Sequence, residues 1–204
     1  MLSIKKSSIS VAAAALSGRL RAGKVYRREE LSSASNAIDR HLQQLQEAGR
    51  LKKLSQGLYY VPRQSVYGSL PPDDKELVAV FLRDNDFLLF SPVSYNSLEL
   101  GGTQLYNRTL VYNHKRHGQF KLGNRTFDFR MKHRFPRKLS PEFLLVDLLN
   151  NIDELAEESA QLLQNAKSKA KNFDHHKLTQ AASNFGTVAT NKLINGWLNE
   201  RVSA

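Results

Sequence analysis

Hydrophobic residues recur with a helical period between Asn36 and Ala48. Ile38, Leu42 and Leu45 are spaced by four and three residues, so they share one face of an α-helix. Gly49 follows, and glycine tolerates the left-handed backbone that ends many helices. The pattern therefore predicts an amphipathic helix over residues 36–48 that ends at Gly49.

A shorter helix is predicted just before it, over residues 27–31, and a serine-rich turn separates the two. Ser33 or Ser35 is expected to cap the second helix, because a serine hydroxyl accepts a hydrogen bond from an unpaired first-turn N–H group. After Gly49, residues 51–54 and 58–61 predict a β-hairpin around the turn Ser55-Gln56-Gly57.

Two further elements complete this region. The alanine-rich stretch that ends near Leu16 predicts a first helix, packed through Val11, Ala15 and Leu16. Lys5 and Lys6 followed by apolar residues also resemble a short signal peptide, but the excess of alanine and the arginines that follow favour the helix. Val25 and Tyr26 are expected to form a small strand that pairs with the hairpin.

The order of these elements predicts a winged helix-turn-helix, whose second helix typically enters the major groove of duplex DNA. Its polar face and the basic hairpin supply side chains that hydrogen-bond base edges and phosphates. We expect DNA to be contacted by Arg27, Ser35, Asn36, Arg40, Gln43, Gln44, Arg50, Lys52 and Lys53.

Residues 67–72 are expected to form a linker after this region, since the paired prolines Pro71 and Pro72 continue neither a helix nor a central strand. We predict two domains, a winged helix-turn-helix over residues 1–68 and a mixed α/β domain with a helical tail over residues 69–204. A helix capped by Asp73 or Asp74 is expected over residues 75–83, and strands are expected at 87–90, 105–113 and 119–130, the last with a turn at Gly123-Asn124. A tail helix capped by Ser140 is expected from Pro141, with an apolar stripe of Phe143, Leu145, Leu149, Ile152 and Leu155, and another helix over residues 187–200. The predicted fold class is α+β.

Charge supports a polyanionic partner for the first domain. The chain carries a net charge of +11, and residues 1–68 hold twelve basic against four acidic side chains, whereas residues 141–204 hold six against eight. A basic N-terminal region that has no long apolar helix favours a nucleic acid over a membrane surface as its partner. The absence of cysteine excludes disulfides and thiolate chemistry and fits a cytoplasmic location.

Two segments, EAGRLKKLSQGLYYVP (Glu47 to Pro62) and SYNSLELGGTQLYNRTLVYNHKRHGQFKLGNRTFDFR (Ser94 to Arg130), resemble parts of a known family. The first is similar to the wing of the AbiEi-type antitoxins, and the second is similar to the second domain of that family. This chain departs from the pattern at Tyr95-Asn96, where alanine-rich residues are expected, and at Leu105-Tyr106, where a proline is expected. The resemblance implies a repressor that binds repeats in its own promoter and counteracts a nucleotidyltransferase-like toxin encoded by a neighbouring gene.

Enzymatic chemistry finds little support in the sequence. His114 and His117 lie in a basic loop with no neighbouring carboxylate, whereas a catalytic zinc site usually needs three ligands and an ordered second shell. Asp128 with Lys132 lacks the second acid that a magnesium-dependent nuclease needs. We therefore expect no enzymatic activity, no metal and no cofactor.

Three functional hypotheses remain from the sequence. The leading one is a DNA-binding antitoxin and autorepressor. The second is a plain winged-helix transcriptional regulator with a ligand-binding or dimerisation domain. The third is a nucleic-acid enzyme or a DNA-modification accessory. The identity of the neighbouring gene discriminates best between the first two.

Overall fold

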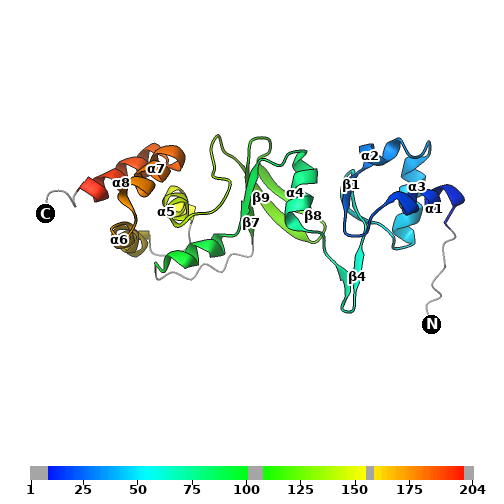
Figure 1. Cartoon of the computed structure of the whole chain (residues 1–204), viewed down its shortest axis with the longest axis horizontal. Coiled ribbons are helices and arrows are strands. Elements are labelled where there is room, and N and C mark those ends of the chain that lie inside the picture. The colour runs from blue at the N-terminus through cyan, green and yellow to red at the C-terminus, as the bar shows by residue number, and fades with distance from the viewer. Residues whose placement is uncertain (1–8, 101–107, 155–158, 200–204) are drawn as a thin grey trace. The chain divides into compact units, whose positions relative to one another are not determined.

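The chain has a mixed α+β fold with a helical C-terminal tail, described by a computed structural model (Figure 1). The structure describes residues 9–100, 108–154 and 159–199. The chain divides into two compact units, the first formed by residues 1–85 with 119–126 and the second by residues 86–118 with 127–204. No helix in the described ranges is long and apolar enough to cross a membrane.

The first unit begins with three helices and a three-stranded antiparallel sheet. The elements follow in the order α1 (Val11–Arg19), β1 (Val25–Arg27), α2 (Arg28–Ser32), α3 (Ile38–Glu47), β2 (Lys52–Ser55) and β3 (Leu58–Tyr60). The strand order is β1-β3-β2, so the short strand at Val25 pairs with the hairpin as predicted. Gly57, in the turn of this hairpin, has a φ of 68°, a conformation that favours glycine.

The core of this region lies between the three helices and the sheet. The predicted apolar face of α3 is confirmed, because Ile38, Leu42 and Leu45 are all buried. The prediction for α1 was wrong in part: Leu16 is buried, but Val11 is 89% exposed. Ala13 is buried instead of Ala15, and Ser10 caps the helix by accepting a hydrogen bond from the Ala13 N–H.

Neither predicted serine caps α3. The helix begins at Ile38, and its N-cap residue is Ala37, whose side chain forms no hydrogen bond. Ser33 is the C-cap residue of α2. Ser35 lies in the turn, where its hydroxyl accepts a hydrogen bond from the Ala37 N–H at 3.1 Å and bonds His41 Nδ1 at 2.7 Å. His41 is buried on α3, so Ser35 stabilises the turn between the helices.

A second hairpin follows at the position where a linker was expected. Strands β4 (Arg63–Ser65) and β5 (Gly68–Leu70) pair antiparallel and project from the three-stranded sheet (Figure 1). The paired prolines come directly after β5, so they end the hairpin rather than mark a flexible connection. The interpretation of residues 67–72 as a linker was wrong for this reason.

The first unit extends beyond the predicted boundary at residue 68. Helix α4 (Asp74–Leu82), capped by Asp73 as expected, contributes Glu76, whose carboxylate accepts a hydrogen bond from the Val25 N–H at 3.1 Å. The tip of the β8–β9 hairpin also belongs to this unit. Its Gly123 N–H donates to the Leu54 carbonyl at 2.7 Å, on the edge strand β2.

The second unit is organised by a four-stranded sheet of order β6-β7-β9-β8, part of whose β8–β9 hairpin is counted with the first unit. Strands β6 (Phe87–Phe90) and β7 (Thr109–Asn113) are antiparallel, and β7 pairs with β9 (Arg125–Met131) in parallel. The turn predicted at Gly123-Asn124 separates β8 (Gly118–Leu122) from β9, which confirms that prediction. Of the strand predicted over residues 105–113, the part up to 107 lies outside the described residues.

Helices form the rest of this unit: η1 (Pro92–Leu98), α5 (Pro141–Asn150), η2 (Ile152–Glu154), α6 (Ser159–Ala170), α7 (His175–Phe185) and α8 (Val188–Asn199). The start of α5 is as predicted, with Ser140 as the cap and Pro141 in the first turn. Every residue from Phe143 to Leu149 is buried, so α5 is a central helix and carries no single apolar stripe. Leu155, assigned to that stripe, lies outside the described residues.

An acidic residue is buried in the middle of α5. Asp147 accepts hydrogen bonds from the Tyr95 hydroxyl at 2.7 Å and from the Tyr112 hydroxyl at 2.8 Å. Burial raises the pKa of the Asp147 carboxyl above its ordinary value, although the two hydrogen bonds oppose this shift. The network joins η1, β7 and α5 at the core of the second unit.

Candidate nucleic-acid interface

The outer face of α3 carries a row of exposed polar side chains. Arg40 and Gln43 are three residues apart on one side of the helix, and the exposed Asn36 lies in the turn before it. No partner of the Asn36 or Arg40 side chain lies among the residues that the structure describes. Gln43 Nε2 donates to Glu47 Oε1 at 2.9 Å, a surface contact within the helix. Arg40 and Gln43 therefore share an accessible face of α3, and Asn36 is accessible in the turn before it.

An ion pair at the start of α3 borders this row. Arg28, in the first turn of α2, donates two hydrogen bonds of 2.6 Å to the carboxylate of Asp39. The pair lowers the pKa of the Asp39 carboxyl and raises the pKa of the Arg28 guanidinium. Asp39 belongs to the polar face of the helix predicted over residues 36–48, but its pairing with Arg28 was not predicted, since two residues eleven positions apart show no helical spacing.

Three of the predicted site residues have structural partners instead. Arg27 Nε donates to the Val80 carbonyl at 2.7 Å and its Nη2 to the Phe81 carbonyl at 2.6 Å. Gln44 Oε1 accepts a hydrogen bond of 2.8 Å from the Ser10 hydroxyl. With Ser35 held in the turn, these side chains connect α3, α1, β1 and α4. Their assignment to DNA contact is not supported by the geometry.

The basic residues of the hairpin are exposed, as a phosphate contact requires. Lys53 has no side-chain partner within the described part of the chain. Lys52 Nζ donates to the Ser69 hydroxyl at 3.1 Å, and Arg50 Nη1 approaches the Ser17 hydroxyl at 3.4 Å. Both contacts are weak surface hydrogen bonds that a phosphate oxygen can replace.

The segment that forms these hairpins carries charge of one sign. Residues 48–72, which include β2, β3, β4 and β5, contain four basic side chains and no Asp or Glu. The four are Arg50, Lys52, Lys53 and Arg63. A surface segment of one sign attracts a partner of the opposite sign over about the Debye length, ~8 Å at physiological salt.

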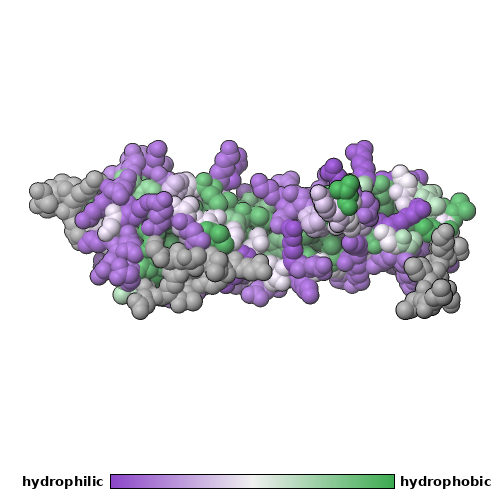
Figure 2. Space-filling model, turned by 90° about the horizontal axis from the view of Figure 1, so that it is seen from below, coloured by the Kyte–Doolittle hydropathy of each residue, from purple (hydrophilic) through white to green (hydrophobic). Residues whose placement is uncertain are grey.

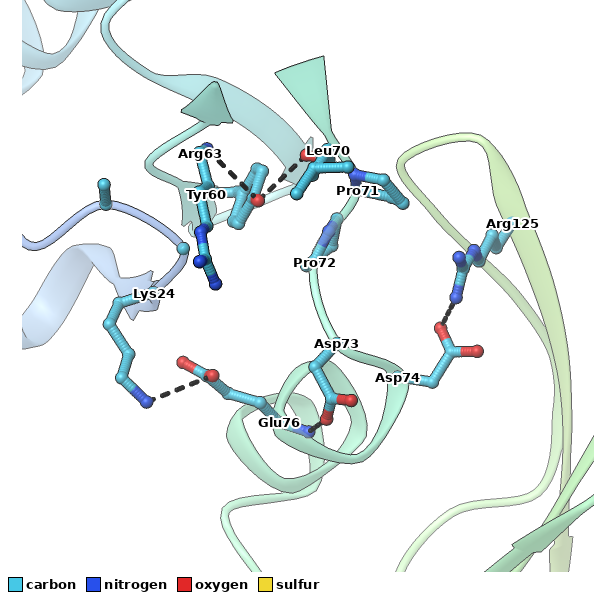
Figure 3. A pocket seen from close by; sticks show the side chains of 12 residues that line it. Lys24, Tyr60, Arg63, Leu70, Pro71, Pro72, Asp73, Asp74, Glu76 and Arg125 are labelled. Atoms are coloured by element: carbon cyan, nitrogen blue, oxygen red, sulfur yellow. Dashed lines mark hydrogen bonds and ion pairs between the residues drawn. The ribbon is translucent and has the colours of Figure 1, made fainter. Parts of the chain in front are cut away.

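A hollow of about 650 Å³ lies beside this segment, between residues 22–24, the β4–β5 hairpin and the start of α4 (Figure 3). Its acidic and basic side chains pair with each other: Lys24 with Glu76 at 3.2 Å, and Arg125 with Asp74. The Arg63 guanidinium points into the hollow (Figure 3). The lining mixes both charges, so it offers no clear preference for an anionic or a cationic small molecule.

The histidine and acidic groups weighed for enzymatic chemistry form other contacts. His114 Nε2 lies 3.4 Å from Asp86 Oδ2, a carboxylate distant in sequence, and its ring stacks on Phe135 at 4.7 Å. Asp128 accepts hydrogen bonds of 3.1 Å from Arg130. Among residues 9–100, 108–154 and 159–199, no three His, Asp or Glu side chains gather where they could hold a metal ion.

Comparison with known proteins gives the fold but no family. No protein-family model and no curated protein matches the chain. The chain is similar to a solved structure, the RV2827C protein from Mycobacterium tuberculosis, with 14% identity and a TM-score of 0.57. The match covers 95% of this chain and 78% of that one. At this identity the likeness shows a shared fold alone. Residues 101–107, part of the segment that resembles AbiEi-type antitoxins, lie outside the described residues.

Proposed function

We propose that this chain is a duplex-DNA-binding transcriptional repressor, in which residues 9–61 act as a winged helix-turn-helix. Helix α3 is its recognition helix, and the β2–β3 hairpin is its wing. The proposal is supported by the order of helices and strands in the first unit and by the strand order β1-β3-β2. A helix with an exposed polar face is of the size that the major groove of B-DNA admits.

The observation that carries the proposal is the row formed by Asn36, Arg40 and Gln43. Arg40 and Gln43 share one exposed face of α3, Asn36 is exposed in the turn before the helix, and the opposite face of the helix is packed in the core. Arginine hydrogen-bonds guanine through two atoms, and asparagine or glutamine does the same with adenine. We assign base contacts to this row and phosphate contacts to Lys52, Lys53 and the other basic residues of the hairpins.

An antitoxin role is the second part of the proposal, and it rests on the sequence resemblance to the AbiEi-type family. On this hypothesis the chain represses its own promoter at repeated sites and counteracts a nucleotidyltransferase-like toxin from a neighbouring gene. Residues 86–118 and 127–204 then contribute to neutralisation. A plain winged-helix regulator, with the second unit as a ligand-binding or dimerisation module, is the alternative.

The DNA part is tested by fluorescence anisotropy with a labelled duplex from the region upstream of this gene and a scrambled duplex of equal length. Arg40→Ala is expected to cost about 1–3 kcal/mol on the upstream duplex and far less on the scrambled one. Lys192→Ala, an exposed charge on α8, is the matched control. Equal loss on both duplexes with Arg40→Ala contradicts the base-reading role.

The antitoxin part is tested by co-expression with the neighbouring toxin gene, together with a reporter fused to the upstream region. We expect the full chain to restore growth and to repress the reporter. Arg40→Ala is expected to lose repression of the reporter and to keep neutralisation of the toxin, because we assign Arg40 to DNA contact alone. Repression without restored growth favours the plain regulator.

A further inference from the structure

The β4–β5 hairpin ends in two apolar side chains that nothing in the described residues covers. Val66 is 93% exposed and Tyr67 is 97% exposed. Viewed from the side to which the hairpin projects, a small hydrophobic group surrounded by hydrophilic residues marks this part of the surface (Figure 2). Their exposure forgoes the free energy that burial of a large apolar side chain contributes, and a partner that covers them regains it.

The turn that carries them is held in one shape. The Ser65 hydroxyl accepts a hydrogen bond from the Tyr67 N–H at 3.2 Å and donates one to the Gly68 carbonyl at 2.9 Å. Gly68 has a φ of 106°, which an L side chain rarely adopts. Val66 and Tyr67 are therefore presented on a defined turn, and little conformational entropy is lost when a partner contacts them.

The base of the hairpin is joined to the proposed wing. The Tyr60 hydroxyl of β3 donates to the Leu70 carbonyl at 2.9 Å and accepts from the Arg63 N–H at 3.4 Å (Figure 3). Lys52 of β2 reaches Ser69 of β5. The two hairpins are connected through strands β2 and β3, so a ligand bound by the wing lies within reach of the second hairpin.

Two observations identify the chemistry of that ligand. The segment from Ala48 to Pro72 is free of acidic residues, which favours a polyanion. Two apolar side chains are far too small for a stable protein interface, which buries roughly 800 Å² on each partner. Proteins that bind the minor groove of DNA combine inserted apolar side chains with basic side chains, and the β4–β5 hairpin offers both, Val66 and Tyr67 at its tip and Arg63 at its base.

We propose that the β4–β5 hairpin is a second wing, which inserts Val66 and Tyr67 into the minor groove beside the major-groove site of α3. The inference rests on the proposed binding of duplex DNA. Tyr67 packs its ring against sugar or a base step, and its hydroxyl hydrogen-bonds a phosphate or a minor-groove acceptor. Arg63, at the base of the hairpin, neutralises a phosphate at the groove edge.

The test uses the full chain and the labelled upstream duplex, with the double variant Val66→Ser/Tyr67→Ser. Val11→Ser, a change at an 89% exposed valine of α1, is the matched control. We expect the double variant to bind about tenfold more weakly, a loss of the size that one apolar insertion contributes. Its thermal unfolding should match that of the wild type, since neither side chain is packed.

Footprinting separates this inference from the proposal on which it rests. With Val66→Ser/Tyr67→Ser, we expect hydroxyl-radical protection of the minor groove to be lost on one side of the α3 site. Dimethyl sulfate protection at guanine N7 in the major groove is expected to be retained. If the double variant keeps wild-type affinity and footprint, the second wing is wrong and the role of α3 stands. If the double variant changes only the self-association of the protein, measured by analytical ultracentrifugation, the hairpin contacts a second copy of the chain and the inference fails. If the wild type binds no DNA, both proposals fail.

Discussion

Arg28 and Asp39 are joined by two parallel hydrogen bonds of 2.6 Å, between the first turn of α2 and the first turn of α3. The pair lies on the surface that we assign to DNA, where the charge of Asp39 alone would repel phosphate. Arg28 compensates that charge, so the polar face of α3 is neutral at this point and positive at Arg40. The pairing also holds the two helices of the proposed DNA-binding motif together.

The first prediction concerns this pair. Arg28→Ala is expected to weaken binding to the upstream duplex and to a scrambled duplex alike, because it leaves the Asp39 carboxylate uncompensated beside phosphates. Asp39→Ala is expected to strengthen binding to both, since Arg28 is then available to a phosphate. The measurement is anisotropy at one salt concentration. A weaker complex with Asp39→Ala would contradict this account of the pair.

The second prediction separates structure from DNA contact at Arg27. Its guanidinium donates to the carbonyls of Val80 and Phe81, which stand at the C-terminal end of α4. Arg27→Ala is expected to lower the free energy of unfolding by about 1.5–3 kcal/mol, since hydrogen bonds from a charged donor are lost. Affinity of the folded protein for DNA should change little.

Urea unfolding and anisotropy on the same preparation check this prediction, with Arg19→Ala, at the exposed end of α1, as the control. If Arg27→Ala leaves the free energy of unfolding unchanged and weakens DNA binding, Arg27 contacts DNA and this prediction is wrong.

The third prediction concerns the buried carboxyl of Asp147. Asp147→Asn is expected to destabilise the chain by about 1–3 kcal/mol, because an amide has one acceptor oxygen for the hydroxyls of Tyr95 and Tyr112. The pKa of Asp147 is raised in the native state, so its stabilising contribution is complete below the unfolded pKa of about 3.9. That contribution is lost as the pH rises through the native pKa.

The difference in stability between the wild type and Asp147→Asn should therefore be largest in acid and should narrow toward neutral pH. Urea unfolding of both proteins across this range measures the difference. A gap that widens as the pH rises would mean that the native pKa is depressed, and the account of this site would be wrong.

Much of the local structure follows from the sequence because its signals are local. The spacing of Ile38, Leu42 and Leu45, the cap at Ser140 and the turn at Gly123 each depend on a few neighbouring residues, and each prediction is confirmed. The β4–β5 hairpin was missed because Pro71 and Pro72 were taken as a linker. They follow β5 directly, and proline is compatible with the end of an edge strand.

The site was harder to predict because side-chain partners come from distant parts of the chain. Arg27 meets carbonyls of α4, and Gln44 meets Ser10 at the start of α1, contacts that no periodicity reveals. Asp147 left one sequence signal, an acid within a continuous apolar run, which is typical of a buried carboxyl with dedicated donors. Arg40 and Gln43 could be predicted because one helix carries both, whereas Asn36, predicted to lie in that helix, lies in the turn before it.

The salt dependence of binding to the upstream duplex tests the central claim most directly. Four phosphate contacts, from Arg50, Lys52, Lys53 and Arg63, predict a slope of log affinity against log salt of about −3.6. Lys53→Ala should bring the slope closer to zero by about 0.9, whereas Arg40→Ala should lower affinity for the upstream duplex more than for a scrambled one. A flat salt response, or no binding at micromolar protein, would contradict the assignment of this chain as a DNA-binding repressor.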